Sequence, residues 1–111
     1  MLLSQAIDMF IDNQKLKGNS EKTILYYKNQ LKYLTNYLGN VDIQDITMQD
    51  LNNYKIHIQD KKSERRRKSE YEPKTLSTVT IATYIRAVRT LFSFLKHEGF
   101  TDLDMQKYPL P

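Results

Sequence analysis

The chain has 111 residues, of which 40% are hydrophobic and 27% are charged, a balance typical of one soluble globular domain. It contains no cysteine and two histidines, which excludes disulfides and thiolate metal sites and argues against any metal or cofactor. No apolar run approaches the ~20 residues of a membrane helix, and the first residues lack the basic start of a signal peptide. We therefore expect a cytoplasmic protein without membrane contact.

Helical periodicity predicts three long helices, over about residues 4–17, 21–38 and 78–98. The first two follow Ser4 and Ser20, which are good N-cap residues. The last helix carries large apolar residues on one wide face, so we expect it to lie centrally and to contact several others. Each helix ends at a glycine, the residue that most easily adopts the left-handed conformation there. These glycines are Gly18, Gly39 and Gly99.

A shorter helix is predicted over residues 48–60. Thr47 is its expected N-cap, and Asp50 lies in the first turn, where the helix dipole favours an anion. The preceding residues 41–46 are partly apolar, which predicts a loop that is pinned into the core. Residues 61–74 lack a helical period and contain a proline, so we interpret them as a loop.

These elements predict an all-α fold, a compact four-helix bundle with a long central C-terminal helix and a basic loop between helices three and four. The domain is expected to span residues 1–100. Two prolines punctuate residues 101–111, which predicts a linker that includes Tyr108.

The cationic excess of the chain lies in one stretch. Residues 61–74 hold seven basic and three acidic residues, so their net charge of +4 equals that of the whole chain. Such a concentration fits a polyanion partner, most simply the phosphates of a nucleic acid. A solvated loop is an equally good interpretation of the run alone. Its arginines are Arg65, Arg66 and Arg67.

The outward side of the last predicted helix combines arginine with small hydroxyl residues. These side chains are donors that suit phosphates and base edges. An ordinary exposed face is the alternative, but such a face usually carries both signs, and no acid occurs from Thr75 to Lys96. The residues on this side are Thr83, Arg86, Thr90, Ser93 and His97, with Thr80 and Arg89 on its flanks.

Two further groups have competing interpretations. Ser20, Lys22 and Thr23 place donors at the N-terminus of the second helix, which suits a phosphate, although Ser20 also serves as a plain cap. Tyrosines on the second helix indicate either packing on the first or third helix or, together with an outward Phe94, a surface for a partner protein. They are Tyr26, Tyr33 and Tyr37. No catalytic arrangement is visible, because Tyr108 lacks the set of positively charged partners with which a tyrosine nucleophile holds a phosphate, and both histidines stand alone.

The order of elements resembles the N-terminal core-binding, SAM-like domain of tyrosine recombinases, the phage integrase and Xer-type enzymes. The resemblance runs from about Leu3 to Phe100. It rests on a Gly-Asn-Ser-x-x-Thr entry to the second helix, a Leu-Gly exit, an Asp-Ile-Thr entry to the third helix, and the motifs Thr-Ile-x-x-Tyr-Ile-Arg-Ala-Val-Arg and Glu-Gly-Phe.

The resemblance implies a DNA-binding domain that clamps one face of a recombination-site duplex during DNA integration or recombination. Its partners would be double-stranded DNA, a C-terminal catalytic domain that is absent here, and other recombinase subunits. The chain itself would then not be an enzyme. A helical protein–protein interaction module without DNA binding is the alternative. The positions that match the DNA-facing helices of the family are Ser20, Lys22, Thr23, Lys28, Thr80, Thr83, Arg86 and Arg89.

Overall fold

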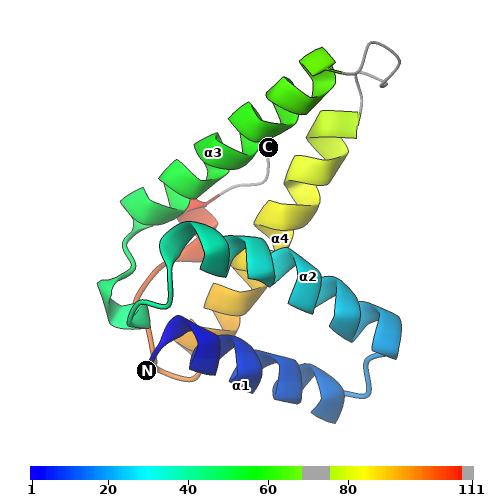
Figure 1. Cartoon of the computed structure of the whole chain (residues 1–111). Helices are drawn as coiled ribbons and strands as arrows, with labels where there is room; N and C mark the ends of the chain where they lie inside the picture. Colours follow the sequence, from blue (N-terminus) through cyan, green and yellow to red (C-terminus); the bar gives the residue numbers. More distant parts are fainter. Residues whose placement is uncertain (69–75, 109–111) are drawn as a thin grey trace.

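The computed structural model describes the backbone of residues 1–68 and 76–108, and the side chains of residues 1–59 and 81–108. Its described part is all-helical, which confirms the predicted fold class (Figure 1). The elements in chain order are α1 (Leu3–Leu16), α2 (Glu21–Leu38), the 3₁₀ turn η1 (Ile43–Asp45), α3 (Met48–Lys68), α4 (Leu76–His97) and the 3₁₀ turn η2 (Met105–Lys107).

Helix α4 is the centre of the bundle, as its wide apolar face predicts. It contacts α1, α2, α3 and η2. Its fully buried side chains remove a broad apolar stripe from water, which is the main force that holds such a bundle together. The stripe consists of Ile85, Val88, Leu91, Phe92 and Leu95.

The caps of α2 and α3 agree with the sequence. The Ser20 hydroxyl accepts a hydrogen bond from the Thr23 backbone amide at 3.3 Å. At the start of α3, the Asp50 amide donates to the Thr47 hydroxyl at 3.2 Å, while the Thr47 amide donates to the Asp50 carboxylate at 2.9 Å. This reciprocal pair is a capping box, so both helix starts are determined locally.

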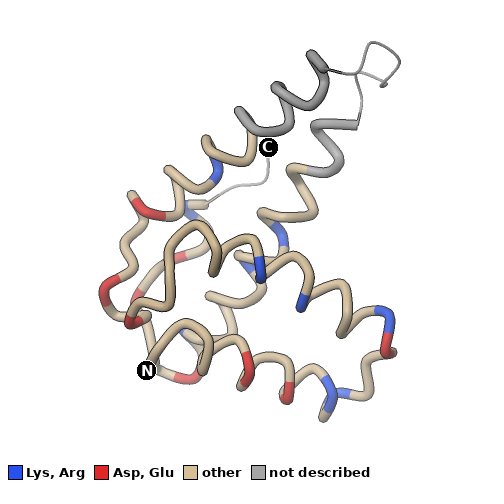
Figure 2. Tube along the Cα trace, viewed as in Figure 1, with Lys and Arg blue, Asp and Glu red and all other residues tan. Residues whose placement is uncertain are grey.

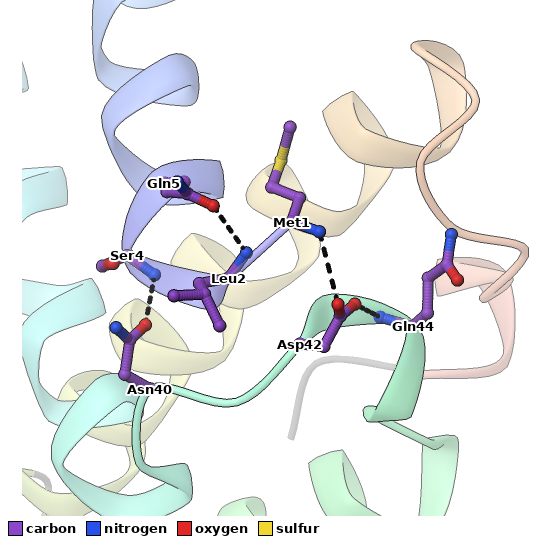
Figure 3. A network of polar contacts seen from close by, with 7 residues as sticks. All are labelled: Met1, Leu2, Ser4, Gln5, Asn40, Asp42 and Gln44. Atoms are coloured by element: carbon purple, nitrogen blue, oxygen red, sulfur yellow. Dashed lines mark hydrogen bonds and ion pairs between the residues drawn. The ribbon is translucent and has the colours of Figure 1, made fainter.

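The start of α1 differs from the prediction, because the helix begins at Leu3 and Ser4 lies inside its first turn. The Ser4 amide instead donates to the side-chain oxygen of Asn40 at 2.9 Å. The Leu3 amide donates to the Val41 carbonyl at 2.8 Å. Beside this contact Leu2 and Asp42, both drawn in Figure 3, form an antiparallel bridge. The connection after α2 therefore caps α1.

Helix α3 extends beyond its predicted end at residue 60 and continues to Lys68. Residues 61–68 are thus helical rather than loop. Lysine and arginine have good helix propensity, so a charged stretch without an apolar stripe can still continue a helix that has already started. Residues 69–74 of the expected loop lie outside the described residues.

Residues 101–108 also differ from the expected linker, since they lie against the bundle. Met105 is 5% exposed and Tyr108 is fully buried. The Tyr108 hydroxyl donates a 2.7 Å hydrogen bond to the Leu51 carbonyl in α3. The folded domain therefore extends beyond the end at residue 100 that the prolines predicted. It does so because the large side chain of Tyr108 anchors this segment in the core.

Candidate nucleic-acid interface

Helices α2 and α4 meet at a polar junction near the N-terminus of α2. The Tyr26 hydroxyl donates to the backbone carbonyl of Thr83 at 3.1 Å. The side chain of Tyr26 is half-buried, and this burial raises the pKa of its hydroxyl, while the positive charge of Arg86 acts in the opposite direction. Arg86 is therefore close enough to Tyr26 to interact with it electrostatically.

The junction gathers several of the predicted site residues. Lys22 precedes Tyr26 by four residues and Thr23 precedes it by three, so all three lie along one side of α2. Lys22 and Arg86 are exposed. The first turn of α2 and the middle of α4 thus present two cations beside the junction.

The N-terminus of α2 adds hydroxyl and amide donors. Ser20 is exposed, and its hydroxyl lies 3.1 Å from that of Thr23. Ser20 caps the helix, as the plain interpretation expects. The helix dipole places partial positive charge here, which favours anions at this end.

The outward side of α4 continues from Arg86 toward its C-terminal end. Ser93 and His97 are exposed, and the hydroxyl of half-buried Thr90 donates back to the Arg86 carbonyl at 2.8 Å. A hollow between this side and α1 is lined by Thr90, Ser93 and His97, and also by Lys17, which follows the end of α1. The hydroxyl of Thr90 therefore donates its hydrogen bond within the helix, whereas the side chains of Ser93 and His97 are accessible to a ligand.

Arg89 differs from Arg86 because it is half-buried. Its Nε atom is buried and has no hydrogen-bond partner within the described part of the chain. An arginine donor without a partner is unusual, because buried polar groups are normally paired.

Not all predicted residues lie at this junction. Lys28 is exposed and lines a hollow with Lys15 of α1, on the opposite flank of α2 from Tyr26, since two helical positions are about 200° apart. Thr80 lies in α4, and Arg65, Arg66 and Arg67 lie in α3, but their side chains are outside the described residues.

Charges are distributed unevenly over the described bundle. Basic positions follow α2 and the middle of α4, whereas acidic positions occur along α1 and the connection after α2 (Figure 2). The α2–α4 side is therefore the one better suited to a polyanion.

The tyrosines of α2 are used mainly within the fold. Tyr33 makes an edge-to-face contact with Tyr84 of α4 at a centroid distance of 5.0 Å. Tyr37 lies 4.7 Å from the ring of His57 in α3. The sequence predicted packing of these tyrosines on the first or third helix. Tyr37 does pack on the third helix, α3, whereas Tyr26 and Tyr33 contact α4 instead. Phe94, expected to point outward, is half-buried and packs edge-to-face on Phe10 at 5.7 Å.

A family model described as "Phage integrase, N-terminal SAM-like domain" matches residues 7–99. No curated protein and no solved structure matches the chain. Among the described residues, no helix is long and apolar enough to cross a membrane. Since the family match covers most of the chain and its fold is a helical bundle, the chain belongs to the phage integrase N-terminal SAM-like domain family.

Proposed function

We propose that this chain is the DNA-binding core domain of a site-specific tyrosine recombinase. In this proposal it clamps one face of a recombination-site duplex and contributes binding rather than strand cleavage. Its partners are double-stranded DNA, the catalytic domain of the recombinase and other recombinase subunits. The family match over residues 7–99 is the observation that carries the proposal.

The geometry of the α2–α4 junction supports the choice of face. Lys22 and Arg86 supply exposed positive charge, and the start of α2 supplies backbone donors. Arginine and lysine beside a helix N-terminus are typical phosphate contacts, which fix orientation on the duplex without reading its sequence. We therefore place the DNA backbone along this junction and expect few base contacts.

In this proposal the remaining predicted residues make contacts at the edges of the interface. Thr80, Thr83 and Arg89 flank the contact on α4, and Lys28 reaches the backbone only where the duplex also passes α1. Basic residues near the end of α3 add phosphate contacts beside the junction. These are Arg65, Arg66 and Arg67.

A protein–protein module without DNA binding has less support. That alternative needs Tyr26, Tyr33, Tyr37 and Phe94 on a free surface. Tyr37 is 39% exposed, but all four side chains have contacts inside the bundle, so the surface on which the alternative depends is largely used by the fold.

Fluorescence anisotropy with a labelled duplex tests the proposal. We expect a dissociation constant of about 10⁻⁴–10⁻⁶ M that weakens steeply between about 50 and 200 mM salt, because phosphate contacts release counterions. Arg86→Ala should weaken binding and lower the salt slope by about one, whereas Lys107→Ala, an exposed lysine on η2, serves as the matched control. Equal effects of the two variants would show that the face is wrong, and an absence of binding at both salts would overturn the proposal.

A further inference from the structure

Helix α1 carries a polar residue in its apolar stripe. The buried side chains of this helix include Leu3, Phe10 and Ile11, and Gln14 occupies the next position of the same stripe. Its side chain is 5% exposed, and no other amide-bearing or charged side chain in the described part of the chain is buried to this degree. Because a buried polar group costs free energy that an apolar one does not, the carboxamide at this position indicates a specific role.

The partner of Gln14 is Asn19, in the turn between α1 and α2. The side-chain nitrogen of Asn19 donates a hydrogen bond to the carboxamide oxygen of Gln14 at 2.5 Å. The backbone amide of Asn19 also donates to the Gln14 carbonyl at 3.2 Å. Two hydrogen bonds therefore tie one residue of the turn to the last full turn of α1. The first of them satisfies a side-chain oxygen that the core would otherwise leave unpaired.

The same turn leads directly into the start of α2. Gly18 has a φ of +81°, a conformation that suits glycine, and its amide donates to the Lys15 carbonyl at 3.0 Å. Asn19 follows, and the next residue is Ser20, the N-cap of α2. Since one peptide unit joins Asn19 to Ser20, the hydrogen bonds of Asn19 fix where the first turn of α2 begins.

The start of α2 is the place where the proposed function puts phosphate donors. A phosphate is bound well only when amides, hydroxyls and cations are held at hydrogen-bond distances from it. A mobile turn would have to be ordered during binding, and that ordering reduces affinity. A turn that two hydrogen bonds already hold in place loses less conformational freedom, so its donors bind more tightly.

We infer that Gln14 is a positioning residue for DNA binding. Through Asn19 it holds the turn before α2, so that Ser20 and Lys22 are presented to the duplex in one fixed arrangement. Gln14 is itself too buried to reach a phosphate. The inference rests on the proposed function. A purely structural role for Gln14 makes a different prediction, because its replacement would then change the stability of the bundle and leave DNA affinity unchanged.

Gln14→Met separates these two roles. Methionine has a similar length and good helix propensity, and it buries no amide, so the urea midpoint should stay level or rise. Asn19 is exposed and can bond to water instead. In anisotropy titrations at about 50 mM salt, the dissociation constant for a labelled duplex should nevertheless increase about two- to tenfold, the equivalent of one hydrogen bond.

The chain offers a matched control in α3. The side chain of Gln49 donates to that of Asn53 at 3.0 Å on the exposed surface, so Gln49→Met removes a glutamine–asparagine hydrogen bond away from the start of α2. This variant should bind DNA like the unmodified chain. Amide hydrogen exchange followed by nuclear magnetic resonance gives a readout without DNA. The amides of Gly18 and Asn19 should exchange faster in Gln14→Met, whereas those in the middle of α4 should not change.

A double variant tests whether the effect passes through Asn19. Gln14→Met and Asn19→Ala remove the same side-chain hydrogen bond, so together they should weaken DNA binding no more than the stronger single change does. Asn19→Ala also provides the DNA measurement should Gln14→Met not fold. Losses that multiply, an equal loss in Gln49→Met, or unchanged exchange at Gly18 and Asn19 would overturn the inference. Absence of DNA binding by the unmodified chain overturns the proposed function, whereas binding that Gln14→Met leaves unchanged overturns this inference alone.

Discussion

The hydroxyl of Tyr108 donates a hydrogen bond to the backbone carbonyl of Leu51, although 57 positions separate the two residues. Tyr108 is fully buried, and Leu51 lies in the first turn of α3. This contact joins the last described segment of the chain to the third helix. Residues 100–108, which follow the end of the family match at position 99, therefore belong to the folded bundle.

Substitutions at Tyr108 should separate packing from hydrogen bonding. Tyr108→Ala removes a fully buried aromatic ring and should lower the free energy of unfolding by about 3–5 kcal/mol, as large-to-small core changes do. Tyr108→Phe keeps the ring and should cost only about 0.5–1.5 kcal/mol. Urea unfolding followed by circular dichroism measures both. A neutral Tyr108→Ala would mean that the segment is not anchored in solution.

Tyr54 differs from Tyr108 because its buried hydroxyl lacks a hydrogen-bond partner among the described residues. Its side chain is fully buried, and its hydroxyl has no hydrogen-bond partner in the described part of the protein. Tyr54→Phe removes this unpaired polar atom while keeping the ring, so the free energy of unfolding should stay the same or rise by up to about 1 kcal/mol. The same urea experiment decides the sign. A loss as large as that expected for Tyr108→Phe would show that the hydroxyl has a partner.

The stability of the bundle should fall at alkaline pH. Burial raises the pKa of Tyr54 and of Tyr108 well above the ordinary tyrosine value. In the unfolded chain both hydroxyls lose their protons near pH 10, whereas in the folded chain they remain protonated. The unfolded state therefore binds fewer protons above pH 10, and the free energy of unfolding decreases as pH rises.

Urea midpoints measured from pH 8 to pH 11 check this expectation. The midpoint should be level at the lower end and should decline above about pH 10. The decline should be shallower in a variant that carries Tyr54→Phe and Tyr108→Phe together. An equal decline in that variant would assign the pH dependence to other groups.

Two variants at the α2–α4 junction should affect DNA binding differently. Tyr26→Phe removes the hydrogen bond to Thr83 without changing charge, so it should weaken affinity by a few fold and leave the salt slope unchanged. Arg86→Ala removes a cation and should lower the slope by about one. Anisotropy titrations at several salt concentrations separate the two effects. A changed salt slope in Tyr26→Phe would contradict the view that Tyr26 only positions the two helices and does not affect the number of phosphate contacts.

Local signals in the sequence predicted the fold where the responsible residues are neighbours. The caps formed by Ser20 and by Thr47 with Asp50 lie within a few positions of the helices they start, so they could be read directly. The start of α1 could not be predicted in this way, because its first amides donate hydrogen bonds to residues 40 and 41, which are distant in the sequence. The anchoring of Tyr108 was missed for the same reason, since nothing in its neighbourhood indicates a partner in α3.

In the candidate site too, the features set by neighbouring residues could be predicted from the sequence, and those set by contacts between helices could not. Periodicity alone places Arg86 on the outward side of α4 and Lys22 at the start of α2. It does not reveal that Tyr26 joins these two helices, because that contact depends on how α2 crosses α4. The proximity of Lys22 and Arg86 to one junction is therefore a tertiary property. Their contacts with DNA stay a prediction.

The bridge between Leu2 and Asp42 also determines where a probe can be attached. It holds the start of the chain beside the connection after α2, with the Met1 amine 3.3 Å from the Asp42 carboxylate (Figure 3). Helix α2 has 18 residues and is about 27 Å long, so its N-terminus lies roughly that far from this bridge. A fluorophore or affinity tag placed ahead of Met1 would thus leave the Ser20 end of α2 uncovered, and immobilised protein would keep its proposed DNA face open to solution.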